Sequence, residues 1–427
     1  MLRRFAFRNF RSYSKDAKLV LTASSRLPEA REGHALSRSG VLPVAALFGG
    51  NGSGKSNLIR ALAAAVEGAR GEGRFQYPVA EPSLLCEGDE AGESGFDLEL
   101  DAPAGSRYRY GLSLDAKGVC AESLEVKERG CWELVFSRSD DALELSGLTP
   151  AAAQAALSGV IRRETMVSAL SSVRDPRIRG FRELLGGFRF VNSEEGVELP
   201  TDFGRRLRTL QARSNFAKFL ASFDASVTGC SLEPAQVGQK AARLLIRHGT
   251  GAAGRDLQLP VTEESAGTRR MVSLYFVLRD VLQRGGVLVA DGLNVGLHPL
   301  LTREIVRLFA SAQDNPRGAQ VLFSTQDSSL LGFKELRRDE IWLVEKSPKG
   351  VSSLKRLVRS RSGRKPRASK LERAYLAGRL GGTQAVKELP LPNLPGSRPA
   401  RPNPSPELKD SVILVDEDTF RKITGRK

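Results

Sequence analysis

The chain has 427 residues, a length that allows two or three structural units. Its 41% hydrophobic and 27% charged residues are typical of a globular protein, and no apolar stretch is long enough to span a membrane. The N-terminal residues lack the apolar core of a signal peptide, so we expect a cytoplasmic protein without membrane contact. Three histidines exclude a His-rich metal site, and four cysteines without C-x-x-C spacing are expected to be reduced thiols.

The first third of the chain reads mainly as strands. Phe5–Tyr13 and Lys18–Thr22 are predicted to be two strands joined by a turn at residues 15–17. The apolar run Val44–Phe48 indicates a buried strand, and Asn57–Val66 has the pattern of a helix. From about residue 95 to 145, apolar residues alternate with polar ones and glycine-containing breaks recur, which predicts an antiparallel meander.

The segment between the buried strand and the helix, Gly49–Ser56, fits the phosphate-loop pattern G-x-x-x-x-G-K-[ST]. Glycines let the backbone curl until successive N–H groups point at one anion, and the following helix N-terminus adds partial positive charge. Lys55 is expected to reach the β- and γ-phosphates, and Ser56 to offer its hydroxyl to Mg²⁺. The predicted ATP-binding residues in and beside this loop are Gly49, Asn51, Gly52, Ser53, Gly54, Lys55, Ser56 and Asn57.

The remainder alternates between helices and strands. Residues 150–226 have a helical period, and we interpret their apolar stripes as core packing. Later elements are predicted as the strands Leu244–Ile246, Leu257–Val261, Val287–Ala290, Val321–Phe323 and Ile341–Val344, and the helices Thr268–Gln283 and Leu300–Ala312. The Pro-rich residues 389–406 are expected to be extended or disordered, and residues 410–427 have the pattern of a small strand and helix.

Two later segments complete a nucleotide site. Asp291 follows the apolar strand Val287–Ala290, as in the second Walker motif, and is expected to hold Mg²⁺ beside Ser56 and to serve catalysis. Glu264–Thr268 precedes a helix, so Ser265 and Gly267 would form an anion site from backbone N–H groups. This segment resembles the signature loop of ABC-type ATPases. In that class, the signature of one protomer closes on the γ-phosphate held by the other.

The stretch 346–379 is strongly basic, with Glu372 its one acid. Such density favours contact with a nucleic-acid backbone without reading of base sequence, while a solvated tail after the last core strand is the alternative. Tyr375 is the only aromatic residue there, and we expect it to pack against the protein. The basic residues are Lys346, Lys349, Lys355, Arg356, Arg359, Arg361, Arg364, Lys365, Arg367, Lys370, Arg373 and Arg379.

Taken together, these motifs resemble the ABC-like AAA ATPase core family of bacterial abortive-infection ATPases, relatives of the RecF, SMC and OLD heads. The resemblance covers about residues 1–380. It rests on Phe5-x-x-x-Asn9-Phe10-Arg11-Ser12-Tyr13, Asn57 after Ser56, Tyr108–Gly111, Glu264–Thr268, Leu297-His298-Pro299, Asp339–Trp342 and Tyr375-Leu376-x-Gly378-Arg379. It implies an ATPase that acts as a nucleotide-gated sensor or scaffold in anti-phage defence, with ATP at a head-to-head dimer interface and a nuclease or toxic effector as partner.

Two departures from the family pattern concern hydrolysis. Family members carry Asp-Glu after the second Walker strand, where this chain has Asp291-Gly292, and a His where it has Gln326. Losing a general base costs about 10²–10⁴-fold in rate, so we expect firm ATP binding with slow or absent hydrolysis. Two alternatives stay open: Glu264 or Asp327 serves as the base, or a partner chain with an intact site completes a mixed dimer.

The predicted fold is α/β: a P-loop ABC-type ATPase head with a mainly parallel core sheet, an antiparallel β subdomain and a helical insertion. The expected domains are lobe I with the phosphate loop and meander (1–150), the helical insertion (151–240), lobe II with the signature and basic region (241–380), and a Pro-rich tail (381–427). A RecF-type DNA-repair or DNA-maintenance ATPase is the alternative function, and an interaction protein with a vestigial nucleotide site is a third. The sequence contains no H-N-H motif and no convincing Toprim-type acidic cluster.

Overall fold

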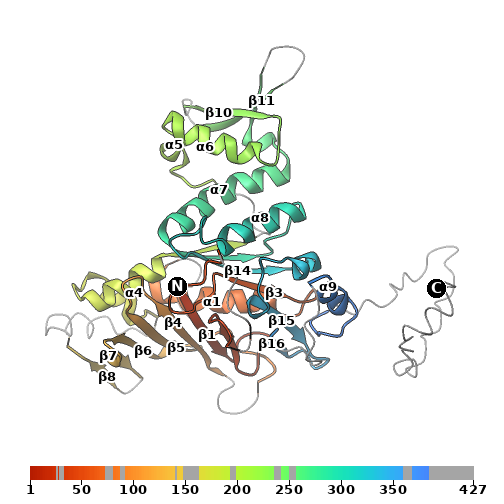
Figure 1. Cartoon of the computed structure of the whole chain (residues 1–427). Coiled ribbons are helices and arrows are strands. Elements are labelled where there is room, and N and C mark those ends of the chain that lie inside the picture. The colour runs from red at the N-terminus through yellow and green to blue at the C-terminus, as the bar shows by residue number, and fades with distance from the viewer. Residues whose placement is uncertain are drawn as a thin grey trace, which may run out of the picture. The chain divides into compact units, whose positions relative to one another are not determined.

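The computed structural model describes residues 1–25, 27, 33–72, 80–86, 92–139, 142–147, 163–192, 199–234, 242–249, 256–358 and 368–383, without the side chains of 368–370 (Figure 1). All of them belong to one unit, Met1–Gln384. The predicted Pro-rich segment 389–406 and the final stretch 410–427 lie outside the described residues.

A six-stranded sheet forms the centre of this unit, in the order β16-β15-β3-β14-β13-β9. Five strands run parallel: β9 (Phe188–Asn192), β13 (Val287–Asp291), β14 (Gln320–Thr325), β3 (Val44–Phe48) and β15 (Ile341–Lys346). The edge strand β16 (Ser352–Arg356) is antiparallel to β15. The mainly parallel core sheet is therefore confirmed.

Two of these strands were not expected. β9 lies in the segment 150–226 that was predicted to be helical, so that prediction is wrong for residues 188–192. β9 is short and only its first residue is buried, which leaves little hydrophobic pattern; pairing with β13 gives it its strand conformation. β16 was not predicted either. It lies within the basic segment, and because only its first residue, Ser352, is buried, its sequence has little hydrophobic pattern.

The predicted meander is part of a seven-stranded antiparallel sheet, in the order β2-β1-β4-β5-β6-β7-β8. The strand at Phe5–Tyr13 was predicted too long: β1 ends at Arg8, because Asn9 (φ 46°) and Arg11 (φ 51°) adopt left-handed backbone conformations and the chain turns. The sheet comprises β2 (Ala17–Val20), β1 (Leu2–Arg8), β4 (Ser94–Asp101), β5 (Arg107–Asp115), β6 (Gly118–Glu128), β7 (Cys131–Arg138) and β8 (Leu143–Leu145).

Helix α1 (Lys55–Arg70) packs in one hydrophobic core with both large sheets. β3 contributes Ala45 and Leu47 to this core, and its alternate residues Val44, Ala46 and Phe48 to a second core with α7 (Ala266–Arg284) and α8 (Pro299–Ala310). Because both faces of β3 are covered, its sequence is a continuous apolar run. The phosphate loop thus lies between a buried strand and a buried helix.

A third sheet, in the order β10-β11-β12, forms a smaller core with α5 (Phe203–Arg206), α6 (Leu210–Ala221) and α7. Its strands are β10 (Val227–Glu233), β11 (Arg243–His248) and β12 (Leu257–Pro260), and Figure 1 shows this lobe beyond α7. The remaining elements are α3 (Met166–Ala169), α4 (Pro176–Gly186), α9 (Ala368–Leu376) and the 3₁₀ turns η3 (Leu170–Ser172), η4 (Val261–Glu263), η5 (Ser328–Gly332) and η6 (Arg338–Glu340). Among the described helices, none has both the length and the apolar character needed to cross a membrane.

Candidate nucleotide-binding site

The predicted phosphate loop joins β3 to α1, and its glycines are required by both backbone conformation and space. Gly52 (φ 71°) and Gly54 (φ 110°) are left-handed. A Cβ added to Gly54 would lie 2.4 Å from Ser352 Oγ, and one added to Gly49 would lie 2.6 Å from the Val344 carbonyl oxygen. Any side chain at these two positions would therefore displace the loop from β15 and β16.

Residues far away in the sequence hold the loop in place. Ser352 Oγ, on β16, donates its one proton to the Ser53 carbonyl (2.7 Å) and shares a second hydrogen bond with Ser12 Oγ (2.8 Å). Ser12 Oγ also accepts from Asn57 Nδ2 (2.7 Å), and the Tyr13 hydroxyl donates to the Gly54 carbonyl (3.2 Å). The opening motif of the chain and β16 therefore both brace the loop. Sequence reasoning missed Ser352 altogether, since nothing local distinguishes it from neighbouring serines.

The loop's side chains fit a polyphosphate. Lys55 is 8% exposed, and its Nζ donates to the carbonyls of Gly49 (2.8 Å) and Gly50 (2.9 Å), so the ammonium lies within the curl of the loop. Burial lowers the pKa of Lys55, and the Asp291 carboxylate opposes that shift. Ser53 Oγ is buried and has no hydrogen-bond partner, while Ser56 is exposed at the start of α1. A ligand with several anionic oxygens would engage these donors.

Asp291 lies at the carboxyl end of β13, and neighbouring groups orient its side chain. Ser324 Oγ, on the adjacent strand β14, donates to Asp291 Oδ1, and Gly292 N donates to the same Ser324 oxygen (2.7 Å). Gly292 has a φ of 70°, a left-handed backbone conformation that glycine adopts without strain. Ser324 was missed as a supporting residue; its position at the carboxyl end of a buried strand was the available signal.

The next residues of the chain after β14 reach the phosphate loop. Gln326 is exposed, and its Nε2 donates to Asn51 Oδ1, which places the Gln326 side chain at the loop's outer end. Asp327 caps η5, where its Oδ1 accepts from Ser329 N (2.9 Å). Thus Gln326 lies beside Asn51 of the phosphate loop, while Asp327 uses Oδ1 to cap η5 and its buried Oδ2 has no hydrogen-bond partner among the described residues.

The signature segment begins α7. Ser265 caps the helix by accepting from Thr268 N (3.1 Å), and a Cβ on Gly267 would lie 3.2 Å from the carbonyl oxygen of Gly296. The signature is therefore in close contact with the loop that follows Asp291. Glu264 is buried, and its Oε1 is hydrogen-bonded to His248 Nε2 (2.9 Å). This carboxylate therefore has a partner within the lobe formed by β10, β11, β12, α5 and α6, which we call the small lobe.

Part of the basic segment serves structure. Arg356 donates to the backbone carbonyls of Asp339 (2.7 Å) and Thr22 (2.6 Å), and its guanidinium lies over the Trp342 ring. Tyr375 is 6% exposed and packs against Phe48, as expected. Lys346, Lys349, Lys355, Arg373 and Arg379 are exposed, whereas residues 359–367 and the Lys370 side chain lie outside the described part. The four cysteines, all within described segments, form no disulfide.

The comparison with protein families identifies the chain. The model for "AAA domain, putative AbiEii toxin, Type IV TA system" matches residues 44–178 and 191–332, more than half of the chain. The chain belongs to this family. It is a P-loop ATPase of the ABC-like AAA core type, and the predicted fold class and family resemblance are confirmed. A search of curated proteins gives no significant match.

Solved structures with the same general fold include three kinds of ATPase. An Smc head bound to the C-winged helix domain of ScpA is 14% identical, with 83% of this chain and 96% of that one covered and a TM-score of 0.41. The recombination mediator RecF is 16% identical, with 83% and 98% covered and a TM-score of 0.38. CbiO1 from Clostridium perfringens, part of the ABC transporter complex CbiONQ, is 13% identical, with 83% and 88% covered and a TM-score of 0.32. These TM-scores are too low to assign function.

Proposed function

We propose that this chain binds ATP with Mg²⁺ through the loop Gly49–Ser56 and hydrolyses it slowly or not at all. The loop amides and Lys55 would hold the phosphates, and Ser56 and Asp291 would hold the metal ion. Asn51, Gly52, Ser53, Gly54 and Asn57 would shape or line the loop. When bound, Mg²⁺ offsets the charge of the β- and γ-phosphates. The observation that carries the binding proposal is the closely packed glycine loop around a buried Lys55.

Slow hydrolysis follows from the groups beside the predicted γ-phosphate position. Gly292 carries no side chain, and the Gln326 amide can orient water but cannot accept its proton. Of the two substitute bases, Glu264 is hydrogen-bonded to His248, and Asp327 caps η5 through Oδ1 while its Oδ2 has no hydrogen-bond partner within the described part of the chain. Asp327 is therefore the stronger candidate of the two; without either base, the loss corresponds to roughly 3–5 kcal/mol of activation free energy.

The biological role that fits such a site is a nucleotide-gated switch. We propose that two copies join head to head, each presenting Ser265 and Gly267 to the nucleotide of the other, and that the ATP-bound dimer controls a nuclease or toxin in anti-phage defence. The family description, with its AbiEii toxin and toxin–antitoxin system, supports this assignment over a RecF-type role in DNA maintenance. The exposed basic residues around Lys346–Arg379 would add nucleic-acid contact without sequence preference.

Turnover measurements test the hydrolysis proposal. Because Gly292 is left-handed, Gly292→Glu introduces strain of about 1–2 kcal/mol together with the carboxylate. Gly292→Gln is therefore the matched control, since it has the same strain and nearly the same shape without a base. We expect slow wild-type turnover and a gain in Gly292→Glu that Gly292→Gln lacks. Fast wild-type turnover that Lys55→Ala abolishes would refute slow hydrolysis, and Glu264→Gln and Asp327→Asn would then locate the base.

Calorimetry and light scattering test binding and assembly separately. We expect Mg²⁺-dependent ATP binding that Lys55→Ala removes, and an ATP-dependent increase in mass that Ser265→Arg prevents. No binding of ATP would leave the chain an interaction protein with a vestigial site. ATP-dependent binding of DNA ends or gaps, in the absence of any effector, would instead favour the DNA-maintenance function.

A further inference from the structure

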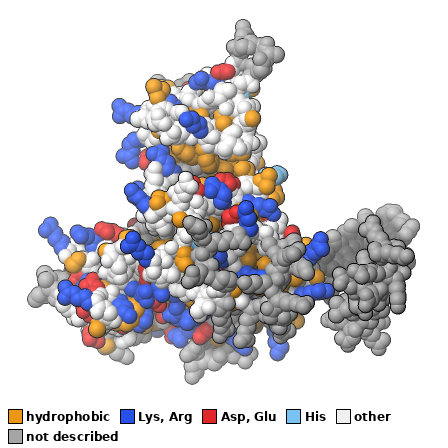
Figure 2. Space-filling view, in the orientation of Figure 1, with side chains coloured by type: hydrophobic (Ala, Val, Ile, Leu, Met, Phe, Trp, Pro, Cys, Tyr) orange, Lys and Arg blue, Asp and Glu red, His pale blue; other side chains and the backbone are white. Residues whose placement is uncertain are grey.

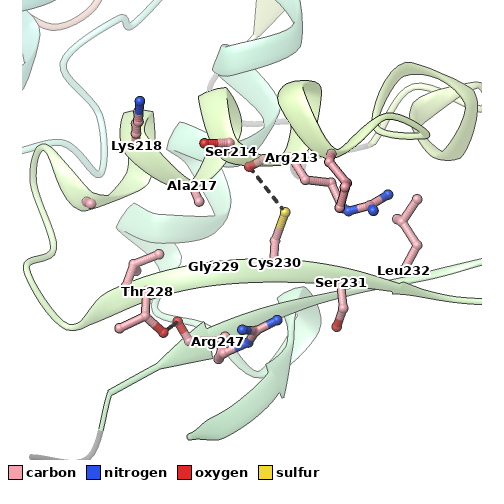
Figure 3. Close-up of a pocket in the computed structure, with 13 residues that line it drawn as sticks. Arg213, Ser214, Ala217, Lys218, Thr228, Gly229, Cys230, Ser231, Leu232 and Arg247 are labelled. Carbon is pink, nitrogen blue, oxygen red and sulfur yellow. Dashed lines mark hydrogen bonds between the residues drawn. The ribbon is translucent and has the colours of Figure 1, made fainter.

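The small lobe contains a groove that the nucleotide site does not use. It has a volume of about 630 Å³ and lies between α6 and β10, far along the chain from the phosphate loop. In Figure 3, Ser214, Ala217 and Lys218 of α6 lie on one side of β10, and Thr228 and Arg247 lie on the other. The groove therefore follows the edge of the strand rather than one face of the sheet.

β10 is an edge strand. Among the described residues it pairs only with β11, on one side. In an antiparallel strand, alternate residues direct their N–H and C=O groups away from the partner, so β10 presents backbone donors and acceptors to the groove from Gly229 onward, after the register shift between Val227 and Gly229. Six consecutive residues, Val227–Leu232, line it. An edge of this length beside a helix is the arrangement to which an extended peptide can add as a further strand.

The groove is also positively charged. Within the part of the chain that the structure describes, its lining includes Arg213, Lys218 and Arg247 and no acidic residue. Arg247 is 3.8 Å from Asp256, which offsets part of its charge, while the Arg213 guanidinium donates to the Leu207 and Arg208 carbonyls and so has a defined position. Figure 2 shows more Lys and Arg than Asp and Glu on the lobe that carries α5 and α6. The charge therefore favours a partner segment that carries carboxylates.

The apolar part of the groove sets a second requirement. Leu210 is 79% exposed, and Ala217, Ala221 and Leu232 add further apolar surface. A strand lying here would bury small apolar or β-branched side chains on the α6 side. Among the described residues, no aromatic side chain lines the groove, so this part lacks the surfaces on which the bases of a single-stranded nucleic acid stack. A peptide therefore fits better than nucleic acid.

We propose that the edge of β10 binds an extended, acidic segment of a partner protein by strand addition. Backbone pairing with Val227–Leu232 would give the segment its register, the apolar wall of α6 would bind its alternate side chains, and Arg213, Lys218 and Arg247 would bind its carboxylates. This proposal does not depend on ATP hydrolysis, so its test is independent of the nucleotide site.

The test uses fluorescence anisotropy with the full chain and a short synthetic peptide, which has alternating Val and Thr in the centre and Asp at both ends. We expect saturable binding of this peptide, with backbone pairing as the main source of affinity. The same peptide with alternate amides N-methylated cannot pair with β10 and should bind at least about tenfold more weakly. A peptide with Lys in place of Asp should also lose binding.

Protein variants locate the site. The double variant Arg213→Glu and Lys218→Glu should weaken binding of the acidic peptide about tenfold or more. Lys334→Glu and Arg179→Glu, exposed cations outside the groove (74% and 76% side-chain exposure), should not change it. Lys55→Ala should bind the peptide normally, which separates this groove from the ATP site.

Three results would overturn the proposal: no binding of the acidic peptide, equal binding of the N-methylated peptide, or equal loss in the control variants. Tighter, salt-dependent binding of a single-stranded oligonucleotide that Arg213→Glu and Lys218→Glu abolish would assign the groove to nucleic acid instead. Thermal unfolding of each variant confirms that the lobe is folded when affinities are compared.

Discussion

Replacing Gly54 by alanine should weaken nucleotide binding far more than replacing Gly52, although both glycines belong to the same loop. Each has a left-handed φ, which costs alanine about 1–2 kcal/mol. A Cβ at Gly52 meets no atom within 4 Å, whereas a Cβ at Gly54 would lie 2.4 Å from Ser352 Oγ and 3.0 Å from Ser12 Oγ. Crowding of this kind costs a further 1–3 kcal/mol or so.

The free-energy costs of backbone strain and crowding can be converted to expected changes in ATP affinity. Gly52→Ala should lower ATP affinity roughly 5–30-fold, and Gly54→Ala roughly 30-fold to several-thousand-fold, because an unliganded loop can relax and the bound loop cannot. The assay is calorimetric titration with ATP and Mg²⁺, together with the free energy of unfolding of each variant. Gly54→Ala should also lower stability more, since Ser352 links the loop to β16.

A double-mutant cycle measures the steric conflict between an alanine Cβ at position 54 and the Ser352 side chain. Ser352→Gly removes both the Oγ and the Cβ that an alanine at position 54 would meet. It also removes the hydrogen bond to the Ser53 carbonyl, so Ser352→Gly alone should weaken binding. In the Gly54→Ala background the same change should restore part of the affinity, with a coupling free energy of about 1–3 kcal/mol. Additive losses, or equal losses in Gly52→Ala and Gly54→Ala, would refute the steric explanation.

Three further predictions concern other parts of the molecule. Ser324→Ala removes the hydrogen bond that orients the Asp291 carboxylate, and should reduce Mg²⁺-dependent ATP affinity by about 1.5–3 kcal/mol while Mg²⁺-independent binding in calorimetry stays unchanged. Gly267→Ala crowds the Gly296 carbonyl and should impair ATP-dependent dimerisation in light scattering, with monomer ATP affinity retained; equal assembly of variant and wild type would contradict this. Burial raises the pKa of the Cys230 thiol to about 11, so its alkylation, followed by peptide mass spectrometry, should keep increasing with pH up to about pH 11. A rate of Cys230 alkylation that stops increasing near pH 9 would contradict the burial of this thiol.

Local pattern was sufficient to predict the elements whose own residues carry a clear hydrophobic period or glycine spacing, even where their partner strands are distant in the sequence. The phosphate loop with its strand and helix, the meander, and the strand that ends in Asp291 were all predicted, since hydrophobic period and glycine spacing specify them within a dozen residues. The roles of Asp291, Gln326, Ser265 and Gly267 stay predictions. Their positions at strand or helix ends agree with the sequence analysis, and the structure adds their hydrogen-bond partners.

Short edge strands were the elements that local pattern missed. β9 and β16 are each five residues long and mostly half-buried or exposed, so their sequences lack a continuous apolar run. Their conformation depends on pairing with β13 and β15, which are distant along the chain. β10 was missed for the same reason, and with it the open groove beside α6.

The sequence by itself therefore determined that the chain is a P-loop ATPase, and the roles of Gly292 and Gln326 in hydrolysis stay predictions. Only the tertiary structure showed what holds the site: Ser12 and Ser352, hundreds of residues apart, meet at Gly54, and Ser324 orients Asp291. The reason is physical. A side chain's type restricts what it can donate or accept, but which partner it meets depends on strand order and on packing between segments that the sequence separates.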